Sequence, residues 1–390
     1  MDPRTNPYAP GAGSPPPELA GREQIIEASS IALDRMCAGL SARSLMLIGL
    51  RGVGKTVLLN RLHNHASAKG FATVLIEAPE KRSLPSLLVP AMRSALLRLD
   101  RLAASGDLAK RALRALGGFV QAMKLKYNDI EFGLDLGIEP GVADTGDLDA
   151  DLISLFQAVG EAARERHTVL ILFIDELQYV PEQQLAALIS ALHRCAQLQL
   201  PVTMVGAGLP QLIGQMGQAK SYAERLFVFT PVGPLSHSDA QIALSAPAKK
   251  FNVIFEAAAL DEILMQTHGY PYFLQEWGKH SWQCALQSPI TLLDVQAATE
   301  QALAELDESF FRVRLDRLTP SEKRYLLAMA QLGQGPHRSG DIATQLGREV
   351  QTVAPTRAKL IDKGMIYSPA HGDTGFTVPL FDAYLRRVME

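Results

Sequence analysis

The pattern of apolar and polar positions divides the chain into three stretches. In the first stretch, up to about residue 233, short apolar runs alternate with segments of helical periodicity. The runs cover residues 44–48, 72–76, 169–174, 201–205 and 226–230. Apolar strands that alternate with helices in this rhythm form a parallel sheet covered by helices on both faces. The predicted fold class is therefore α/β.

The second stretch, residues 234–310, contains helical patterns only. Capping-box spacings, with Asp in the place of Glu or Gln, mark helix starts at Ser236–Asp239 and Thr291–Asp294. We predict a small helical domain, a lid, whose helices lie near 237–248, 257–267, 271–286 and 292–306.

The third stretch, residues 311–390, opens its pattern with a full capping box and a proline, Thr319-Pro320-Ser321-Glu322. Three helices and a two-strand ribbon around 370–373 follow, with the helices near 320–331, 339–346 and 351–364. This order is typical of a winged helix, a relative of the helix-turn-helix.

Two segments stand outside this scheme. Residues 1–18 carry six prolines and predict an extended lead-in, with helix signals from Pro17-Glu18 onward. The domain that follows, 19–233, contains an insertion at 80–148. Helical periodicity at 86–103 and 107–124 and strict alternation from Ile130 to Ile138 predict two helices and a strand. The insertion either contacts a partner or, as we favour, extends the sheet with a helical cover.

The acidic loop 139–151 within this insertion has five carboxylates. Their spacing does not match that of an EF-hand calcium loop. We therefore expect this loop to be solvated and mobile rather than a calcium site.

Composition limits the classes of protein that the chain can belong to. It has 390 residues, of which 47% are hydrophobic and 20% charged, as in globular proteins. We expect no transmembrane helix, since no apolar run reaches 18 residues, and no secretory signal, since an apolar N-terminal region is lacking. Three widely spaced cysteines argue against a disulfide framework. Together these features predict a cytoplasmic protein.

The net charge of −3 is unevenly distributed. From residue 311 onward the chain has 12 Lys and Arg against 8 Asp and Glu, a net +4, whereas the remainder carries −7. A basic C-terminal part suggests an anionic partner, although an ordinary solvated surface carries the same balance.

The segment from Gly49 to Thr56 fits the pattern G-x-x-x-x-G-K-[ST] between an apolar strand and a helix. Its glycines let backbone N–H groups turn toward a phosphate, and the start of the helix favours anions. Lys55 would bridge the β- and γ-phosphates of ATP, and the Thr56 hydroxyl would bind Mg²⁺. The predicted nucleotide contacts here are Gly49, Arg51, Gly52, Val53, Gly54, Lys55, Thr56 and Val57.

A second acidic feature follows the apolar run 169–174. Asp175 and Glu176 end this buried strand and so lie at the edge of the sheet where ligands bind. We predict that Asp175 binds Mg²⁺ and that Glu176 orients and deprotonates the attacking water. With Lys55, Glu176 is the predicted catalytic residue of an ATP hydrolase.

With these motifs the chain resembles AAA+ and STAND-type P-loop ATPases, particularly the branch that includes origin-recognition-like initiators. The resemblance covers residues 18–310 and includes Ala20-Gly21-Arg22-Glu23, which looks like the family's entry motif before the first strand. The family carries a polar sensor at the end of the strand at 202–205. This chain has no Asn, Ser or Thr at that tip, so backbone groups would have to replace it.

The resemblance also assigns roles further along the chain. Arg225 occupies the place of an arginine finger, which acts on a neighbouring subunit; otherwise it caps the preceding helix. Gly269 and Pro271 resemble the Gly-x-Pro motif that approaches the nucleotide in STAND lids, and they also suit a simple helix break. Trp277 and Trp282 on the next helix are interpreted as lid core rather than a ligand cage.

For the C-terminal module, the third helix of a winged helix enters the DNA major groove. The predicted nucleic-acid contacts are Gln351, Thr352, Thr356, Arg357 and Lys359. Winged helices also serve as protein-contact domains, notably in STAND proteins, and this alternative stays open.

Three hypotheses for the function result. The first is an AAA+ ATPase that acts on DNA through its winged helix. The second is a STAND-type signalling switch whose winged helix contacts protein. The third is an ATP-binding partner subunit of a mobile-element or defence operon. Candidate partners are double-stranded DNA, further copies of the chain or another protein, without a membrane.

Overall fold

The chain divides into two compact units. In this computed structural model, residues 12, 79–81, 102–106, 125, 128, 131–136, 371 and 390 are not described, and all others are. The unit that we call the sheet unit comprises Arg22–Ile48 and Lys55–Pro231. The other, called the helical unit, comprises Met1–Gly21, Gly49–Gly54 and Val232–Glu390. Each is described by itself.

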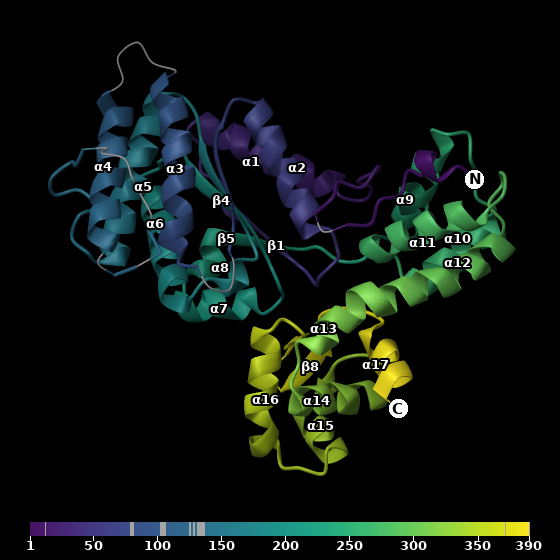
Figure 1. Cartoon of the computed structure of the whole chain (residues 1–390). Coiled ribbons are helices and arrows are strands. Elements are labelled where there is room, and N and C mark those ends of the chain that lie inside the picture. Colours follow the sequence, from purple (N-terminus) through teal and green to yellow (C-terminus); the bar gives the residue numbers. More distant parts are fainter. Residues whose placement is uncertain are drawn as a thin grey trace. The chain divides into compact units, whose positions relative to one another are not determined.

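A parallel sheet of five strands forms the centre of the sheet unit (Figure 1). Its strands are β1 (Ser44–Ile48), β2 (Ala72–Glu77), β3 (Leu170–Asp175), β4 (Val202–Gly208) and β5 (Phe227–Pro231). They lie in the order β2-β3-β4-β1-β5, and every pairing is parallel. All residues of β3 and β4 are buried, as expected for strands covered on both faces. The predicted α/β fold with a parallel sheet is confirmed.

Helices cover both faces of this sheet (Figure 1). The elements are α1 (Glu23–Cys37), α2 (Lys55–Ala68), α3 (Leu84–Arg101), α4 (Asp107–Lys124), α5 (Leu148–Glu165), α6 (Glu182–Gln197), α7 (Leu212–Ala219) and α8 (Ala223–Leu226). Right-handed crossovers explain their distribution. The chain moves from β1 to β2 in one direction along the sheet and from β2 through β3 and β4 to β5 in the other. Consequently α2 lies on one face, and α3, α5 and α6 lie on the opposite face.

The insertion forms a helical cover, as favoured from the sequence. Helices α3 and α4 are where the periodicity predicts them, and they bury Leu96, Leu116 and Phe119 completely in the main core. The strand expected from Ile130 to Ile138 falls largely on residues outside the described part of the chain.

The acidic loop contains one buried carboxylate, which corrects the expectation of a fully solvated loop. Asp151 is 0% exposed, and its oxygens accept hydrogen bonds from the N–H groups of Thr145 and Gly146 and from the Thr145 hydroxyl. Asp147 caps α5 by accepting from the Ala150 N–H. These carboxylates therefore hold the loop on the start of α5.

The first helix begins later than the sequence suggests. Helix α1 starts at Glu23, not near Pro17-Glu18. Gly21 has a φ of +69°, a left-handed conformation that a continuous helix cannot contain.

The lead-in packs firmly within the helical unit. Tyr8 is 4% exposed, and its hydroxyl donates to the Leu244 carbonyl. Its ring fits against Gly278, where a Cβ would lie 2.7 Å from the Tyr8 ring. The indole N–H of Trp282 donates to the Asp2 carbonyl at 3.0 Å. The proline-rich segment is thus a docked strap, with one 3₁₀ turn, η1 (Pro3–Thr5).

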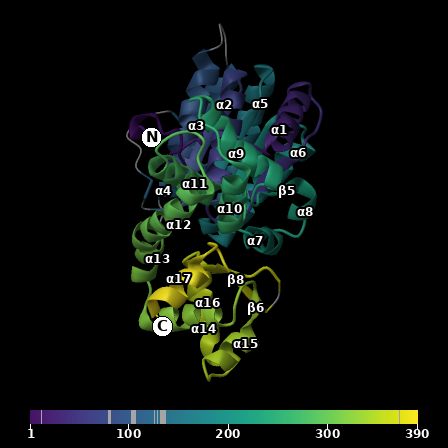
Figure 2. The same cartoon turned by 90° about the vertical axis from the view of Figure 1, so that its right-hand side faces the viewer.

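The lid of the helical unit consists of α9 (His237–Lys249), α10 (Ala257–Thr267), α11 (Pro271–Cys284) and α12 (Leu292–Glu305). These helices lie together in both views (Figures 1 and 2). Trp277 and Trp282 are 0% and 1% exposed, so their interpretation as lid core is confirmed. The capping box at Thr291 makes both of its reciprocal hydrogen bonds.

The lid continues into the C-terminal module without a break. A π-helical segment, η3 (Leu306–Phe311), joins α12 to α13 (Arg312–Asp316). The boundary predicted at 310/311 therefore lies inside a continuous helical run, a feature that periodicity cannot separate from two adjoining helices. No helix among the described residues is long and apolar enough to cross a membrane.

The C-terminal module contains the predicted helices and two elements more. It consists of α14 (Pro320–Gln331), β6 (His337–Arg338), α15 (Ser339–Gln345), α16 (Val350–Asp362), β7 (Ile366–Tyr367), β8 (Asp373–Phe376) and α17 (Phe381–Met389). The expected ribbon of β7 and β8 gains a third antiparallel strand, in the order β6-β8-β7. Thr319 and Glu322 form the predicted capping box at the start of α14.

Because Tyr8 fills a site in the lid, Tyr8→Ala should lower the free energy of unfolding of the lid by about 3–5 kcal/mol. Urea denaturation followed by tryptophan fluorescence measures this, since both tryptophans lie in the lid. Arg4→Ala is the control and should cost less than about 0.5 kcal/mol, because Arg4 is exposed. Equal stability of the two variants would show that the strap contributes nothing.

Candidate nucleotide site

The predicted phosphate loop joins the end of β1 to the start of α2 and depends on its glycines. Gly52 and Gly54 have φ angles of +82° and +90°, which other residues rarely adopt. At Gly49 a Cβ would lie 2.0 Å from the Val232 carbonyl oxygen. The glycine pattern of the motif therefore follows from the shape of this loop.

Two oxygen ligands meet where α2 begins. The Thr56 hydroxyl donates to Asp175 Oδ2 at 2.6 Å, and Asp175, the last residue of β3, is 5% exposed. Burial raises the pKa of the Asp175 carboxyl above its usual value, and the hydrogen bond from Thr56 opposes this shift. A buried carboxylate beside a hydroxyl suits Mg²⁺, which prefers oxygen ligands, and a cation there would favour the ionised form.

Glu176 is set at an angle to the strand that it follows. It has φ 51° and ψ 37°, a left-handed conformation that is unusual for glutamate. Its N–H donates to Asp175 Oδ1 at 2.8 Å, which stabilises this turn. Its side chain is partly exposed, as a general base that must meet water requires.

A glutamine that the sequence reasoning did not select touches this carboxylate. Gln178, in the 3₁₀ turn η2 (Leu177–Tyr179), donates from Nε2 to Glu176 Oε2 and accepts the Leu209 N–H at 3.1 Å through Oε1. Leu209 directly follows β4, which runs to Gly208 rather than ending at 205 as predicted. The only sequence signal was an amide two residues after Glu176.

The sensor strand has the composition that the sequence indicates. Thr203 is buried and lies 3.2 Å from the Ser44 hydroxyl, far back along β4 from its tip. No side chain of Asn, Ser or Thr stands at the tip, but the Gln178 amide reaches it from η2. The sequence pointed to backbone groups as the substitute, and it did not indicate this side chain.

Within the helical unit, residues Gly49–Gly54 of the phosphate loop contact the lid and the C-terminal module. The Tyr270 hydroxyl donates to the Arg51 carbonyl, and the Tyr272 N–H donates to the Gly52 carbonyl at 3.2 Å. The Arg51 N–H donates to the Thr377 carbonyl at 3.3 Å. Neither tyrosine nor Thr377 was predicted from the sequence, because a contact with a main-chain group requires no particular side chain at its partner.

Gly269 and Pro271 lie at the break between α10 and α11. Gly269 has a φ of +69°, and a Cβ there would lie 2.6 Å from the Leu235 carbonyl oxygen. Pro271 is the first residue of α11. This geometry fits the helix-break interpretation, and the residues beside the motif that touch the phosphate loop are Tyr270 and Tyr272. Contact of Gly269 and Pro271 with a nucleotide stays a prediction.

Arg225 lies in the last turn of α8, directly before the edge strand β5. Its side chain is exposed. This position leaves the guanidinium accessible to another subunit, and its role as an arginine finger stays a prediction.

The five predicted nucleic-acid contacts on α16 differ in their surroundings. Gln351, Thr352 and Lys359 are exposed. Thr356 is half-buried, and Arg357 donates to the Thr374 hydroxyl, the Ser368 hydroxyl and the Asp373 carbonyl. These three bonds hold Arg357 against β8, and its role as a DNA contact stays a prediction, as it does for the other four residues.

A second cluster of polar groups lies in the lid. Glu276, His280 and Glu305 are, among the described residues, close enough to share a metal ion. However, the Lys279 ammonium is 2.6 Å from Glu305 and 3.7 Å from Glu276, so a cation already neutralises these carboxylates. We interpret the cluster as an ion-pair network between α11 and α12.

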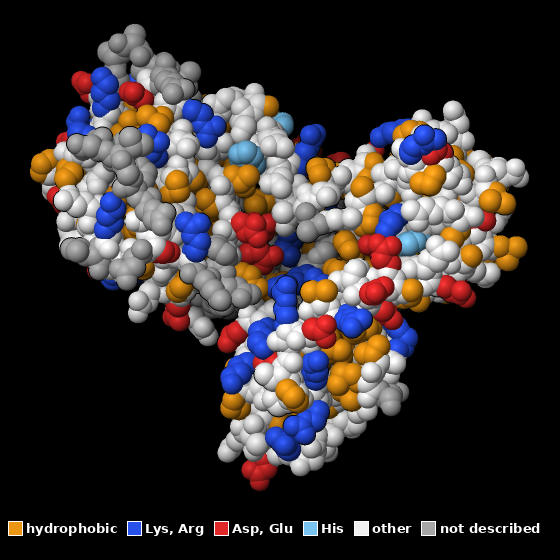
Figure 3. Space-filling model, in the orientation of Figure 1, with side chains coloured by type: hydrophobic (Ala, Val, Ile, Leu, Met, Phe, Trp, Pro, Cys, Tyr) orange, Lys and Arg blue, Asp and Glu red, His pale blue; other side chains and the backbone are white. Residues whose placement is uncertain are grey.

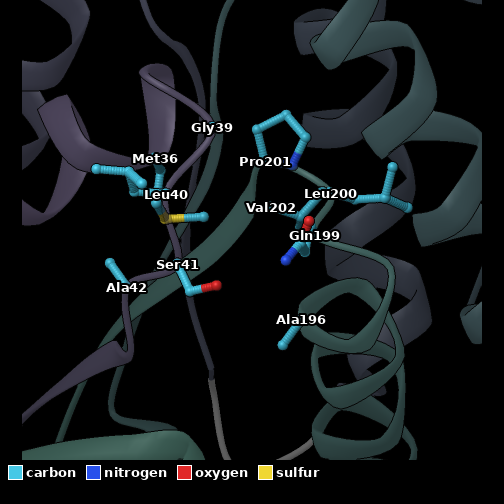
Figure 4. Close-up of a pocket in the computed structure, with 10 residues that line it drawn as sticks. All are labelled: Met36, Gly39, Leu40, Ser41, Ala42, Ala196, Gln199, Leu200, Pro201 and Val202. Carbon is cyan, nitrogen blue, oxygen red and sulfur yellow. The ribbon is translucent and has the colours of Figure 1, made fainter.

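One hollow of the sheet unit lies beside the starts of β1 and β4 (Figure 4). It is formed by the segments that precede β1 and β4 and is lined by Met36, Gly39, Leu40, Ser41, Ala42, Ala196, Gln199, Leu200, Pro201 and Val202. None of these side chains carries a charge, and Ser41 and Gln199 are the polar ones.

Comparison with known families gives two matches. Residues 18–205 match the AAA ATPase domain, and residues 308–385 match a domain of unknown function (DUF8462). No curated protein sequence matches the chain.

Comparison with solved structures gives further similarities. The Walker-type ATPase PABY2304 of Pyrococcus abyssi is 16% identical, with a TM-score of 0.60 over 94% of this chain and 96% of that one. The Orc1 protein of Aeropyrum pernix, solved in complex with DNA, is 15% identical, with a TM-score of 0.48 over 95% and 94% of the two chains. The RuvB Holliday junction branch migration motor of Thermotoga maritima is 16% identical, with a TM-score of 0.44 over 94% and 95%.

The sheet order, the phosphate loop and the acidic end of β3 together define a P-loop ATPase. More specifically, residues 18–205 match the AAA ATPase domain, so this part of the chain is an ATPase domain of the AAA+ class.

If Glu176 is the base, Glu176→Gln should lower kcat for ATP hydrolysis about 100-fold or more while ATP still binds. Lys55→Ala should instead weaken ATP binding itself. Phosphate release and fluorescent-nucleotide binding measure the two effects. The matched control is Glu182→Gln, which makes the same change at an exposed position on α6 and should leave both unchanged. Full hydrolysis by Glu176→Gln would refute the assignment.

Proposed function

We propose that the chain is an ATP-driven molecular switch in which the phosphate loop controls the C-terminal module directly. The observation that carries this proposal is the hydrogen bond from the Arg51 N–H in the phosphate loop to the Thr377 carbonyl in the C-terminal module. A main-chain contact of this kind changes whenever the loop changes its conformation. In this proposal the module responds to nucleotide through that contact.

The proposed chemistry needs few residues. Lys55 stabilises charge on the β- and γ-phosphates, and Glu176 takes a proton from the attacking water. Thr56 and Asp175 would hold Mg²⁺, which neutralises charge on the phosphate oxygens when bound. The hydrogen bond between Thr56 and Asp175 already brings their oxygens together.

A second connection runs through the lid. The Tyr272 N–H binds the Gly52 carbonyl, and the Tyr272 ring stacks on Phe310 with ring centroids 4.9 Å apart. The Arg314 guanidinium lies 3.7 Å above the same Phe310 ring. Phe310 and Arg314 belong to the continuous helical run from α12 to α13, which leads into the C-terminal module. A shift of Gly52 would thus be passed to that helix.

We further propose that the module is a winged helix and that its output is DNA binding. Several Lys and Arg side chains lie on the face of this module in view in Figure 3. Arg338, Arg348 and Lys359 are exposed and, within the described residues, take part in no ion pair. Free cations beside the exposed Gln351 and Thr352 suit contact with phosphates and base edges.

A STAND-type switch is the second candidate, and one observation favours it. The C-terminal module already makes a protein contact, at the phosphate loop, through the buried Thr377. In this alternative the module holds the ATPase in one state, and its other surfaces bind protein instead of DNA.

The two candidates differ in salt-dependent duplex binding. We expect the chain to bind a DNA duplex with an affinity that differs between ATP and ADP. Arg348→Ala with Lys359→Ala should weaken binding and reduce the slope of log K against log salt by about 2, near 0.9 for each lost phosphate contact. Fluorescence anisotropy across a salt series measures this.

Lys110→Ala provides the control for this experiment, because Lys110 is an exposed cation on α4, outside the module. It should leave both affinity and slope unchanged. If the chain binds no duplex with ATP and none with ADP, DNA binding is excluded as the output and the protein-contact candidate is favoured.

A further inference from the structure

The Gln178 side chain lies between the proposed base and the end of β4. Its Nε2 donates to Glu176 Oε2, and its Oε1 accepts the Leu209 N–H at 3.1 Å. Both ends of the amide are therefore in use. The residue is 7% exposed, so these bonds are made away from solvent, where losing a partner is costly.

The tip of β4 is shaped to receive this amide. At Gly208 a Cβ would lie 2.9 Å from Gln178 Oε1 and 2.7 Å from Leu212 Cδ2. At Gly206 a Cβ would lie 2.7 Å from Met46 Sδ and 3.1 Å from Leu177 Cδ2, beside the same turn. A side chain at either position would push η2 away from the strand. Because Gly206 and Gly208 have no side chains, the tip of β4 lacks a polar side chain and has room for Gln178.

The backbone conformation of Glu176 explains why the Gln178 amide is needed to position its carboxylate. Glu176 has a left-handed backbone conformation and follows the last residue of β3. Its side chain therefore points away from the direction that a further strand residue would have. The N–H of Glu176 is fixed by Asp175, whereas its carboxylate accepts a hydrogen bond from Gln178. Without that bond the carboxylate would rotate about its own χ angles.

We propose that Gln178 is a positioning residue for ATP hydrolysis, which holds the Glu176 carboxylate and ties it to the end of β4. It takes the place of a polar side chain on the strand itself. The proposal rests on the assignment of Glu176 as the base. It adds that any movement of the β4 tip at Leu209 is transmitted through one amide to the carboxylate.

Two substitutions test the bonds separately. Gln178→Met keeps the length and packing of the side chain but removes both hydrogen bonds. Gln178→Glu keeps an oxygen for the Leu209 N–H but, when ionised, has no donor for Glu176 and repels it. Each should lower kcat about 10- to 100-fold, since small misplacement of a catalytic group has effects of this size. The KM for ATP and the Kd of a fluorescent ADP should stay within about two-fold.

The matched control is Gln184→Met on α6. Gln184 is also a buried glutamine, 8% exposed, whose Oε1 accepts a main-chain N–H, that of Leu84, at 2.7 Å. It should lower the Tm to a similar degree as Gln178→Met but leave kcat nearly unchanged. This comparison separates positioning from a general loss of packing.

The outcomes are distinct. Normal kcat in both Gln178 variants overturns the proposal, as does a parallel loss of kcat, ADP binding and Tm, which would indicate a structural role. If Glu176→Gln lowers kcat and the Gln178 variants do not, only the positioning role fails. If Glu176→Gln itself hydrolyses ATP normally, the assignment of the base fails instead.

Discussion

The complete burial of the central parallel strands is the constraint on which the rest of the structure depends. Strand β3 is enclosed along its whole length and contains no polar side chain before Asp175. Polar groups can therefore stand only where the strand reaches the edge of the sheet. Because β1, β3 and β4 run parallel and adjacent, the phosphate loop, the Asp175-Glu176 pair and Leu209 all follow strands that end at that edge. The site is a consequence of the sheet.

Much of the fold could be predicted because its cause is local. Short apolar runs indicated the five strands, and capping boxes at Thr291 and Thr319 indicated helix starts, since both signals reside in a few neighbouring residues. The phosphate loop was predictable for the same reason: Gly52 and Gly54 adopt angles that few other residues tolerate.

The features that were not predicted all depend on contacts between residues that lie apart in the sequence. In the sequence Tyr8 is part of a proline-rich lead-in. It is buried because Gly278, which has no side chain, leaves space for its ring. Gln178 becomes part of the site because Gly208, thirty positions later, leaves room for it. The contacts of the Arg357 guanidinium with Thr374, Ser368 and Asp373 were likewise not predicted, because these partners lie 11 to 17 positions further along the chain. The sequence around a single residue does not indicate which distant residue it contacts.

The phosphate loop has two kinds of neighbour, which makes it suitable as a switch. The pattern G-x-x-x-x-G-K-[ST] provides N–H groups for phosphate, whereas the carbonyls of Arg51 and Gly52 and the N–H of Arg51 are bound by Tyr270, Tyr272 and Thr377. In the proposed function, a loop that is held by protein on one side and would be held by phosphate on the other couples the two. The adjoining segments η3 and α13 contain Phe310 and Arg314, respectively, and the Arg314 guanidinium lies over the Phe310 ring.

Hydrogen exchange of the C-terminal module in defined nucleotide states tests this coupling most directly. The Glu176→Gln variant, saturated with Mg·ATP or with Mg·ADP, keeps each state from changing during the measurement. The account predicts that protection of the segment 364–378, which contains Thr377, differs between the two states. Identical exchange throughout residues 311–390, with both nucleotides shown to be bound, would contradict it.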